Sequence, residues 1–290
     1  MSTVSVVVTY NCGNEYYVNF LSLYQQIDHV IIVDNGSDAA TIECLKAIEI
    51  EFSTHVTFVY NPTNQGLAAA QNIGIKLAES MNCEWILLLD DDSTLAPDMV
   101  ANMLSFYHNC NNPNVTILAP RLIERDMGND MGYFLAKFKL CPRATLYGCS
   151  NLSVMYAIAS GSLIKADLFK KIGYMNEEFF IDYIDIDFCL RVKQIGGLII
   201  AVASAILVHK VGDKSLHKAG VVNVITSNHS ALRRYYIYRN RKEVWRKYLR
   251  IFPRFVFYDI MAAVYDVLRI AIFEDNKREK LKQICRGLRA

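Results

Sequence analysis

Residues 85–93 read Trp-Ile-Leu-Leu-Leu-Asp-Asp-Asp-Ser, an apolar run that ends on three consecutive carboxylates. The apolar part is short and closed by polar residues, which predicts a strand. Similar short runs lie at residues 4–9, 30–33, 56–60 and 115–118. Amphipathic stretches with helical spacing separate them, at residues 16–26, 39–47, 67–78 and 97–107. This alternation predicts an α/β fold with a Rossmann-like, mostly parallel sheet flanked by helices.

The rest of the chain is less regular. Residues 121–160 show no clean period. After them the pattern predicts a helix at 163–169, a helix at 187–195 and a strand at 198–208. Neither an internal repeat nor a linker rich in Pro, Gly or Ser divides the chain. We therefore predict one main domain over residues 1–224 and a C-terminal helical appendage over residues 225–290.

The composition excludes a disordered, collagen-like or low-complexity protein, because 52% of the 290 residues are hydrophobic and 21% are charged. The net charge of +2 hides an asymmetry. Residues 231–290 contain 16 Lys and Arg against 6 Asp and Glu, whereas residues 1–230 contain 15 against 23. The start of the chain has no signal-peptide pattern, and no two of the eight cysteines have CxxC spacing. We expect a cytoplasmic protein with reduced thiols.

Residues 251–273 form the only long apolar run, but Arg254, Asp259, Asp266 and Arg269 interrupt it, so it is a poor transmembrane helix. At about 100° per residue, these four charges fall in one sector of the helix. The sequence therefore predicts an amphipathic helix. It leaves two arrangements open, in which the helix packs on the body of the protein or lies on an anionic membrane surface.

The predicted strands end in polar residues, at positions 9–11, 34–37, 61–66 and 90–92. Ligands of open parallel sheets bind at these carboxyl ends. Neither a GxGxxG motif after the first strand nor a GxxxxGK[ST] motif occurs, so the usual phosphate cradles are absent. The three carboxylates at 90–92 repel one another, and a divalent cation would relieve this repulsion. The alternative is that Asp92 or Ser93 caps the helix that begins near Pro97.

A second carboxylate cluster lies among aromatic residues at 179–191. Burial there would raise the pKa of Asp185 and suit it to general-base chemistry. Asp182 would share a helical face with Asp185 if the helix has already begun, and Asp187 is placed to form a surface ion pair with Arg191. His209, at the end of a predicted strand, is either a hydrogen-bonded structural residue or a metal ligand.

In this order and spacing, the motifs resemble those of the family 2 glycosyltransferases, enzymes with the GT-A fold that use nucleotide-sugar donors. The pieces that carry the resemblance lie at 4–11, 32–37, 61–68, 88–93, 159–162 and 180–191. The string Arg-Tyr-Tyr-Ile-Tyr-Arg-Asn at 234–240 is also similar to one in the rhamnosyltransferase branch. Ile184 stands where many members have Glu, which favours a deoxysugar donor. Phe188 replaces a Trp common in that branch and leaves the acceptor open.

The resemblance implies a role for individual residues. Asp185 would be the catalytic base, and Asp92 would bind Mg²⁺ or Mn²⁺ with His209 and Asp90. The donor would be bound by residues at the strand ends, namely Thr9, Tyr10, Asn11, Asp34, Asn35, Asn64, Gly66, Asn72, Asp90 and Asp91. The acceptor side would include Ser160, Gly161 and Asp182. Residues 160–162 alone read equally well as a tight turn.

The implied reaction is an inverting, metal-dependent transfer of a sugar to a hydroxyl group of a glycan or lipid-linked acceptor in surface polysaccharide synthesis. The favoured donor is dTDP-L-rhamnose, and a galactofuranosyl or other hexosyl donor is the alternative. Residues 245–290 would make a peripheral contact with the inner face of the plasma membrane. The oligomeric state stays open.

The basic tail and the sheet are also compatible with two other functions. A nucleotide- or polyanion-binding protein would use the basic tail and its aromatic residues to hold nucleic acid. The acidic body would repel phosphates, so we expect no nucleic-acid partner. A nucleotidyltransferase would need a basic Gly-rich loop after the first strand, which the sequence lacks.

Overall fold

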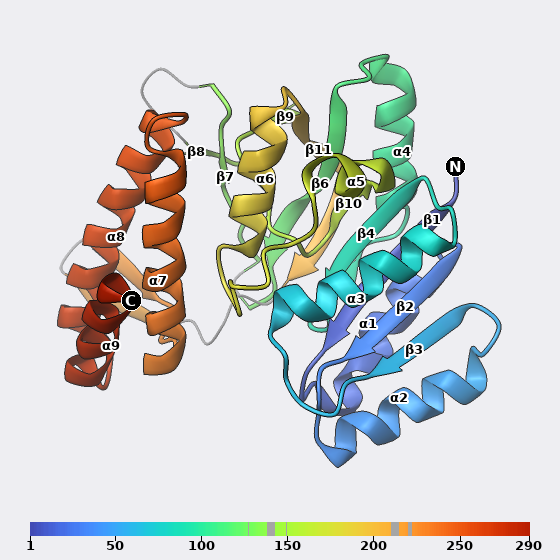
Figure 1. The fold of residues 1–290 in the computed structure, drawn as a ribbon, viewed down its shortest axis with the longest axis horizontal. Helices are drawn as coiled ribbons and strands as arrows, with labels where there is room; N and C mark the ends of the chain where they lie inside the picture. The colour runs from blue at the N-terminus through green and yellow to red at the C-terminus, as the bar shows by residue number, and fades with distance from the viewer. Residues whose placement is uncertain (127, 138–142, 149, 210–214, 220–221) are drawn as a thin grey trace. The chain divides into compact units, whose positions relative to one another are not determined.

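The computed structural model describes residues 1–126, 128–137, 143–148, 150–209, 215–219 and 222–290 (Figure 1). The chain forms two compact units. The first comprises residues 1–178 and 185–210, and the second comprises residues 179–184 and 211–290. The domain boundary predicted between residues 224 and 225 stays a prediction, because a division by contacts does not show which part folds or acts alone.

Four parallel strands form the N-terminal half of the main sheet, in the order β3-β2-β1-β4. They are β1 (Thr3–Thr9), β2 (His29–Asp34), β3 (Val56–Tyr60) and β4 (Trp85–Asp90). The helical segments between them are η1 (Gly13–Glu15), α1 (Tyr16–Tyr24), α2 (Ala39–Glu51) and α3 (Leu67–Ser80). The predicted alternation of strands and helices is confirmed for this half of the sheet.

Local sequence explains how these helices start and pack. The carboxylate of Asp38 caps α2 by accepting a hydrogen bond from the Thr41 backbone N–H at 3.0 Å. Gly74 lets α3 approach β1 closely, because a Cβ at this position would lie 2.3 Å from Cγ1 of Val6. Trp85, Ile86, Leu87 and Leu88 of β4 are fully buried. Each large apolar side chain so buried contributes about 1.5–3 kcal/mol.

The second half of the sheet contains an antiparallel strand. β10 (Ser162–Lys165) lies between β4 and β6 (Val115–Glu124) and runs antiparallel to both. β11 (Leu198–His209) continues the sheet parallel to β6. The helix predicted at 163–169 is therefore wrong for its first three residues, since α5 begins only at Ala166. Leu163 and Ile164 are apolar because they lie in a central strand of the sheet, where they are buried. Their apolar character therefore does not indicate a helix.

Short strands and three further helices complete this unit. Two short strands pair antiparallel with β11, namely β5 (Thr94–Leu95) and β9 (Leu152–Val154). A separate pair consists of β7 (Tyr133–Phe134) and β8 (Arg143–Ala144). The helices are α4 (Met99–Cys110), α5 (Ala166–Ile172) and α6 (Ile184–Gln194). Together the elements form a mostly parallel sheet flanked by helices, as predicted (Figure 1).

The described part of the C-terminal unit contains three helices and a two-stranded antiparallel sheet. The helices are α7 (Ala231–Tyr248), α8 (Pro253–Phe273) and α9 (Lys277–Arg289), and the strands are β12 (Ser215–Ala219) and β13 (Val222–Thr226). Ser230 caps α7, because its hydroxyl accepts a hydrogen bond from the Arg233 backbone N–H. Gly287 allows α9 to pack closely on α7, since a Cβ there would lie 2.5 Å from the carbonyl oxygen of Tyr235.

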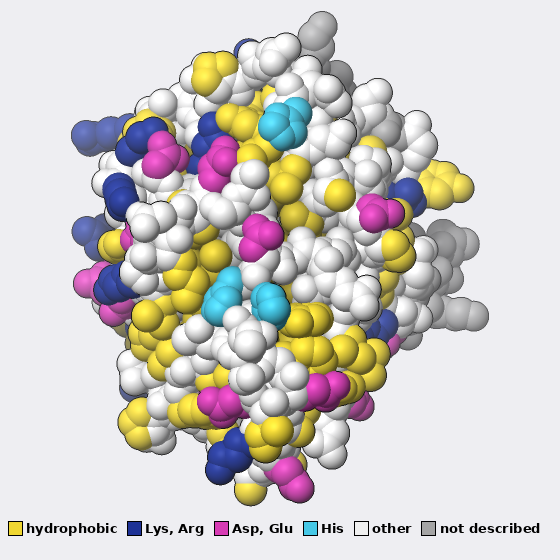
Figure 2. Space-filling model, turned by 90° about the vertical axis from the view of Figure 1, so that its right-hand side faces the viewer, with side chains coloured by type: hydrophobic (Ala, Val, Ile, Leu, Met, Phe, Trp, Pro, Cys, Tyr) yellow, Lys and Arg dark blue, Asp and Glu magenta, His cyan; other side chains and the backbone are white. Residues whose placement is uncertain are grey.

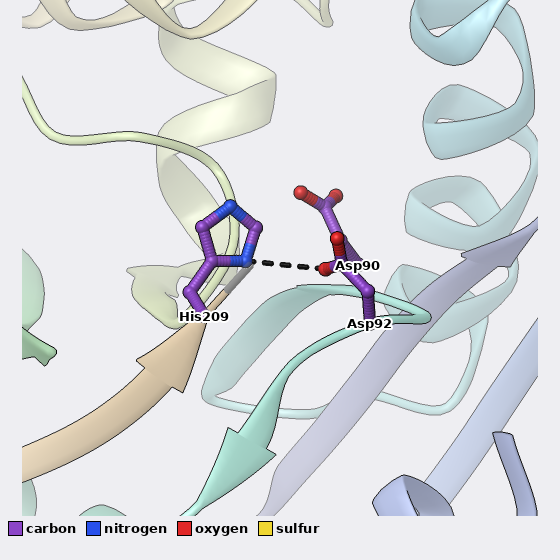
Figure 3. A group of neighbouring side chains, drawn as sticks. All are labelled: Asp90, Asp92 and His209. Atoms are coloured by element: carbon purple, nitrogen blue, oxygen red, sulfur yellow. Dashed lines mark ion pairs between the residues drawn. The ribbon is translucent and has the colours of Figure 1, made fainter. Parts of the chain in front are cut away.

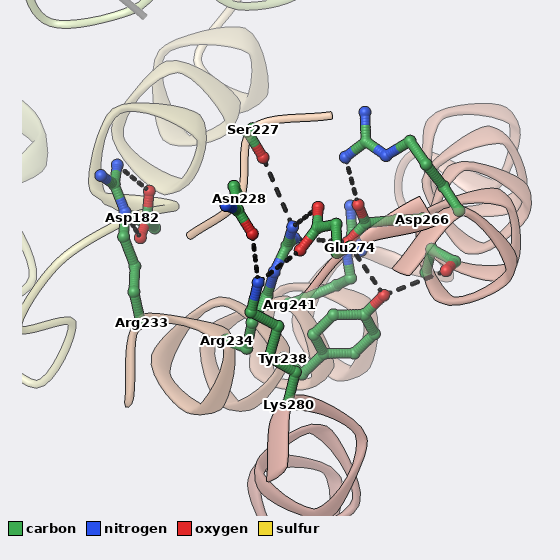
Figure 4. Close-up of polar contacts among 12 residues, drawn as sticks. Asp182, Ser227, Asn228, Arg233, Arg234, Tyr238, Arg241, Asp266, Glu274 and Lys280 are labelled. Atoms are coloured by element: carbon green, nitrogen blue, oxygen red, sulfur yellow. Dashed lines mark hydrogen bonds and ion pairs between the residues drawn. The ribbon is translucent and has the colours of Figure 1, made fainter. Parts of the chain in front are cut away.

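Three of the four charges of α8, Asp259, Asp266 and Arg269, form ion pairs within this unit, whereas Arg254 is exposed. Asp266 pairs with Arg234 of α7 at 2.8 Å and with Arg269 at 2.5 Å (Figure 4). Asp259 pairs with Arg241 at 3.2 Å. The predicted amphipathic helix is present. The two sides of the helix are reversed relative to an ordinary surface helix, because the carboxylates are turned inward.

Charges on the face drawn in Figure 2 are scattered, with acidic and basic side chains lying among uncharged ones. No described helix is long and apolar enough to cross a membrane. The cysteines that the structure describes are free thiols at positions 12, 44, 83, 110, 189 and 285. The prediction of reduced cysteines is confirmed for these six, and Cys141 and Cys149 lie outside the described residues.

Candidate active site

The topology brings the predicted site residues of the first unit to one edge of the sheet. β1, β2, β3, β4, β6 and β11 run in one direction, so their carboxyl ends share that edge. β10 runs the opposite way, which places its first residue, Ser162, at the same edge. Thr9, Asp34, Asp90 and His209 are the last residues of their strands. This edge is the ligand-binding edge of open α/β sheets.

A buried carboxylate organises the turn after β2. One oxygen of Asp34 accepts hydrogen bonds from the backbone N–H groups of Gly36 and Ser37, both at 3.1 Å. Its other oxygen accepts from the Thr9 hydroxyl at 3.2 Å. Asp34 and Thr9 are buried. They therefore hold the ends of β1 and β2 together at the predicted donor site.

Amide side chains brace the loop after β3. The Asn35 carboxamide donates to Oδ1 of Asn64 at 3.1 Å and to the Gly66 carbonyl at 3.3 Å. Its Oδ1 accepts from Asn61 Nδ2 at 3.2 Å and from the Gln65 backbone N–H at 3.0 Å. The predicted donor residues Asn35, Asn64 and Gly66 are thus brought together in one hydrogen-bonded loop.

The remaining predicted donor residues differ in accessibility. Tyr10 is 48% exposed, and its backbone N–H donates to Oδ2 of Asp91 at 2.9 Å. Asn11 has a left-handed backbone and accepts from the Asp38 N–H at 2.8 Å. Asn72 is buried, and its side chain bonds the backbone of Met175 and the carboxylate of Glu177. The structure therefore shows Asn72 anchoring the segment after α5, and its contact with a nucleotide stays a prediction.

Asp90, Asp92 and His209 converge at the sheet edge (Figure 3). Their ligand atoms all lie within 4.8 Å of one another. His209 Nδ1 lies 3.2 Å from Oδ1 of Asp92. His209 is largely buried, whereas both carboxylates are half-buried. Two carboxylates and an imidazole are a donor set that suits Mn²⁺ and Mg²⁺, so the residues predicted to bind a metal ion are placed where they could share one.

The electrostatics of this cluster favour a cation. Burial lowers the pKa of His209, but the hydrogen bond that its ring donates to the Asp92 carboxylate and the charges of Asp90 and Asp92 outweigh burial, so the pKa is raised. Burial, with a smaller contribution from the charges of Asp90 and Asp92, raises the pKa of Asp91 to about 7 against the lowering effect of the hydrogen bond from the Tyr10 N–H. The charges of Asp90 and Asp92 thus contribute to the raised pKa of both His209 and Asp91.

Two side chains that the sequence analysis gave no role at the site hold this cluster in place. The Ser93 hydroxyl lies 2.8 Å from His209 Nδ1 and 2.8 Å from the Ser160 hydroxyl. Arg125 donates to the Asp92 carbonyl at 2.6 Å, and its backbone N–H donates to the His209 carbonyl at 3.0 Å. No motif spacing marks Arg125, because it reaches the site only through the pairing of β6 with β11. The capping role considered for Asp92 and Ser93 is wrong, since α4 begins at Met99 after Asp98.

Residues 160–162 form the turn that leads into β10. The Ser160 hydroxyl accepts from the Asp90 N–H at 3.0 Å, and the Gly161 N–H donates to the Leu88 carbonyl at 2.8 Å. Gly161 has φ +83°, and a Cβ there would lie 2.7 Å from Cδ2 of Leu207 and 2.8 Å from Cγ of Pro120. The turn therefore needs glycine both for its backbone conformation and for its space.

We expect Gly161→Ala to lower the free energy of unfolding by about 1–3 kcal/mol through the left-handed strain, plus the cost of the clash. Gly196→Ala is the matched control, because Gly196 has φ +79° but nothing within 4 Å of its Cβ position. Thermal unfolding should therefore show a larger loss for Gly161→Ala than for Gly196→Ala. Equal losses would contradict the role given to the contact with Leu207 and Pro120.

Asp185 lies in the first turn of α6, where it is half-buried. One oxygen accepts a hydrogen bond from the Ile186 N–H at 2.8 Å. The predicted ion pair between Asp187 and Arg191 is present at 2.9 Å. It was expected at the surface, but the Asp187 side chain is only 2% exposed. The pair is buried because Arg191 also donates to the carbonyls of Ile172 and Tyr174, which ties α6 to the end of α5.

Residues 179–184 belong to the C-terminal unit. Asp182 and Tyr183 both have left-handed backbones, with φ of 65° and 66°. α6 begins only at Ile184, so the expectation that Asp182 and Asp185 share a helical face is wrong. Arg233 binds both carboxylate oxygens of Asp182, at 2.9 and 3.0 Å. The predicted acceptor residue Asp182 is therefore already held by α7 (Figure 4).

The same turn explains part of the 234–240 string. The Asn240 carboxamide donates to the carbonyls of Ile181 and Asp182, each at 2.9 Å. The Tyr183 hydroxyl donates to Asp259 at 2.9 Å. Strained backbones of this kind persist where several contacts hold them. Asn240 thus fixes the chain immediately before the residue predicted to be the base.

Comparison with known proteins identifies the family. Residues 5–173 match the family model described as glycosyl transferase family 2. The chain belongs to this family. It is 31% identical to the dTDP-rhamnosyl transferase RfbF of Shigella flexneri over 247 residues, which cover 84% of this chain and 79% of RfbF. The protein is therefore an enzyme, a glycosyltransferase, as the motifs predicted.

Solved structures confirm the GT-A fold of this glycosyltransferase. Residues 1–349 of S. aureus TarS, crystallised with UDP, align with a TM-score of 0.57 at 15% identity over 99% of this chain and 71% of that chain. GalNAc-T7, crystallised with UDP, GalNAc and Mn²⁺, aligns with a TM-score of 0.58 at 14% identity over 72% of this chain and 43% of that chain. At these identities the likeness concerns the fold alone.

Proposed function

We propose that this glycosyltransferase transfers L-rhamnose from dTDP-L-rhamnose to a hydroxyl group of a glycan or lipid-linked acceptor, with inversion at the anomeric carbon. The observation that carries the proposal is the convergence of Asp90, Asp92 and His209 at the carboxyl edge of a family 2 sheet. The similarity to a dTDP-rhamnosyl transferase supports the choice of sugar. The half-buried Asp185 supports the presence of a base.

In this proposal the strand ends bind the nucleotide. Asp34, held by Thr9 and the turn after β2, presents a buried carboxylate where the base and ribose would lie. The loop braced by Asn35 and Asn64 borders the diphosphate. The Asp91 carboxylate accepts a hydrogen bond from the Tyr10 backbone N–H. In this proposal Asp91 would lie next to the ribose and sugar.

Asp92, Asp90 and His209 would hold Mg²⁺ or Mn²⁺. A bound ion supplies positive charge that offsets the negative charge of the diphosphate leaving group. Ser93 and Arg125 keep His209 and Asp92 in position. The cluster thereby takes the place of the phosphate-binding loop that the sequence lacks.

Asp185 accepts the proton of the acceptor hydroxyl. The acceptor oxygen then forms a bond to the anomeric carbon on the face opposite the diphosphate, and the bond from that carbon to the diphosphate oxygen breaks. One such displacement inverts the configuration. The products are the glycoside, a nucleoside diphosphate and a protonated Asp185.

The experiment is to incubate the purified protein with a panel of nucleotide sugars and an acceptor extract, and to measure nucleoside diphosphate release. We expect release from dTDP-L-rhamnose in the presence of Mn²⁺ or Mg²⁺. Chelation with EDTA should abolish it, and added Mn²⁺ should restore it. Melting temperature measured with each donor provides a second readout, because a ligand that binds the native state stabilises it.

Each other outcome has a definite meaning. Release from a galactofuranosyl or another hexosyl donor alone would replace the sugar but keep the mechanism. Undiminished turnover in EDTA would overturn the metal-dependent proposal. Asp98→Asn serves as a control for Asp92→Asn, because Asp98 lies at the start of α4 and outside the cluster. Only Asp92→Asn should weaken Mn²⁺ binding measured by calorimetry.

A further inference from the structure

An apolar stripe runs along the exposed side of α8. Its members are large apolar residues that are 37–59% exposed, spaced three or four positions apart or adjacent: Phe257, Ile260, Met261, Val264, Tyr265, Leu268 and Ile272. We call this surface the α8 stripe. At 1.5 Å per residue it extends about 22 Å along the helix. Exposed apolar surfaces that are continuous in this way mark interaction sites.

Polar contacts on the opposite side of α8 hold the helix in the orientation that leaves the stripe exposed. Asp259 accepts hydrogen bonds from the Tyr183 hydroxyl at 2.9 Å and from Trp245 Nε1 at 2.7 Å. Asp266 is bound by Arg234, Arg269 and Tyr238. Turning α8 to bury the stripe would break these contacts, including the buried ion pair between Arg234 and Asp266, which is strongly unfavourable. The stripe is therefore exposed because the polar side of α8 is already occupied.

Positive charge lies at the N-terminal end of the stripe. Between Glu243 and Asp259 the chain carries four basic residues and no acidic one: Arg246, Lys247, Arg250 and Arg254. All four are exposed. Arg254 lies in the first turn of α8, one turn before Phe257. An apolar helix side next to a cluster of cations is the combination that binds anionic bilayers.

We propose that the α8 stripe inserts into the surface of an anionic lipid bilayer, with these four cations at the headgroups. A second copy of the chain fits less well, because a stable interface buries about 800 Å² of accessible surface per partner, more than the seven partly exposed side chains of this one helix side offer. Like-charged basic clusters would also repel each other in a parallel pairing of two α8 helices. Interfacial helices need no larger surface than one apolar side.

This inference rests on the proposed function only for the role of bilayer binding, which would place the enzyme where a lipid-linked acceptor is found. Its test uses the full chain without donor, acceptor or metal. The protein is sedimented with vesicles of phosphatidylcholine containing 30% phosphatidylglycerol, or of phosphatidylcholine alone, at low and high salt. We expect binding to the anionic vesicles, weakened by salt because screening reduces the attraction of the cations.

The variant Phe257→Gln/Leu268→Gln should reduce the partition coefficient by about a hundredfold, because burial of each of the two large apolar side chains is worth about tenfold. Both positions are exposed, so the variant should keep the melting temperature. Ile50→Gln is the matched control, since Ile50 is 82% exposed on α2 of the other unit. It should bind vesicles like the wild type.

Equal binding of wild type and the stripe variant would overturn the proposal. So would binding that does not depend on anionic lipid. A concentration-dependent dimer, detected by light scattering and lost in the stripe variant, would assign the surface to a second copy instead. A protein that binds vesicles but releases no nucleoside diphosphate would leave this inference standing and overturn the proposed function.

Discussion

Asp185→Asn should reduce kcat by about 10²–10⁴-fold, the usual contribution of a general base. Asparagine has nearly the same shape, and its Oδ1 can still accept the hydrogen bond from the Ile186 N–H. The substitution therefore removes the capacity to take a proton and leaves the start of α6 in place. KM for the donor should change little, because the base acts on the acceptor. Steady-state kinetics with saturating Mn²⁺ and a melting curve measure these quantities.

Asp187→Asn is the informative control for this prediction. Asp187 lies two residues away on the same helix, but its carboxylate forms the buried ion pair with Arg191. Loss of that charge should lower the melting temperature and leave most of kcat for the protein that remains folded. The two variants thus separate chemistry from stability. A stable Asp185→Asn enzyme with wild-type kcat would exclude Asp185 as the base.

The sequence sufficed to predict the parallel half of the sheet and the grouping of Asp90, Asp92 and His209. The end of each strand is visible as an apolar run that meets polar residues, and parallel strands bring those ends to one edge. The pattern of strand ends therefore groups Thr9, Asp34 and Asp90 without further information. His209 joined them because β11 runs in the same direction as β4.

Features that depend on non-local pairing could not be predicted in this way. Leu163 to Lys165 form an antiparallel strand between β4 and β6, which a local pattern cannot distinguish from a buried helix. The burial of Asp187 depends on the carbonyls at the end of α5. The Ser93 hydroxyl contacts the His209 ring although the two residues lie 116 positions apart in the chain. Arg125 lies 84 positions from His209 and meets it through a backbone hydrogen bond.

The orientation of α8 illustrates the same limit. Its four charges on one sector predicted an amphipathic helix, and a surface helix normally turns such a sector to water. Arg234 and Arg241 of α7 reverse this, because they supply partners for Asp266 and Asp259 inside the unit. The sequence shows that the helix has two different sides, but only the neighbouring helix decides which side is buried.

Glu274→Gln should destabilise the C-terminal unit by about 3–5 kcal/mol, the usual cost of breaking a buried ion pair from one side. The Glu274 side chain is fully buried and joins Arg234 of α7 at 2.7 Å to Lys280 of α9 at 3.0 Å (Figure 4). Arg234 keeps Asp266, but that carboxylate is already shared with Arg269. Among the residues that the structure describes, Lys280 then keeps the neutral oxygen of Asn228 as its hydrogen-bond partner. Uncompensated positive charge would therefore remain between three helices.

Hydrogen exchange followed by mass spectrometry should show faster exchange throughout α7, α8 and α9, together with a lower melting temperature. Glu279→Gln on α9 is the matched control: its side chain is 51% exposed and lies 3.9 Å from Lys282, so the substitution should cost less than about 1 kcal/mol. Adding Lys280→Met to Glu274→Gln should recover part of the loss, because it removes one of the two stranded cations. A double variant no more stable than Glu274→Gln would show that packing, and not charge balance, makes Glu274 important, because the excess charge would then carry no cost.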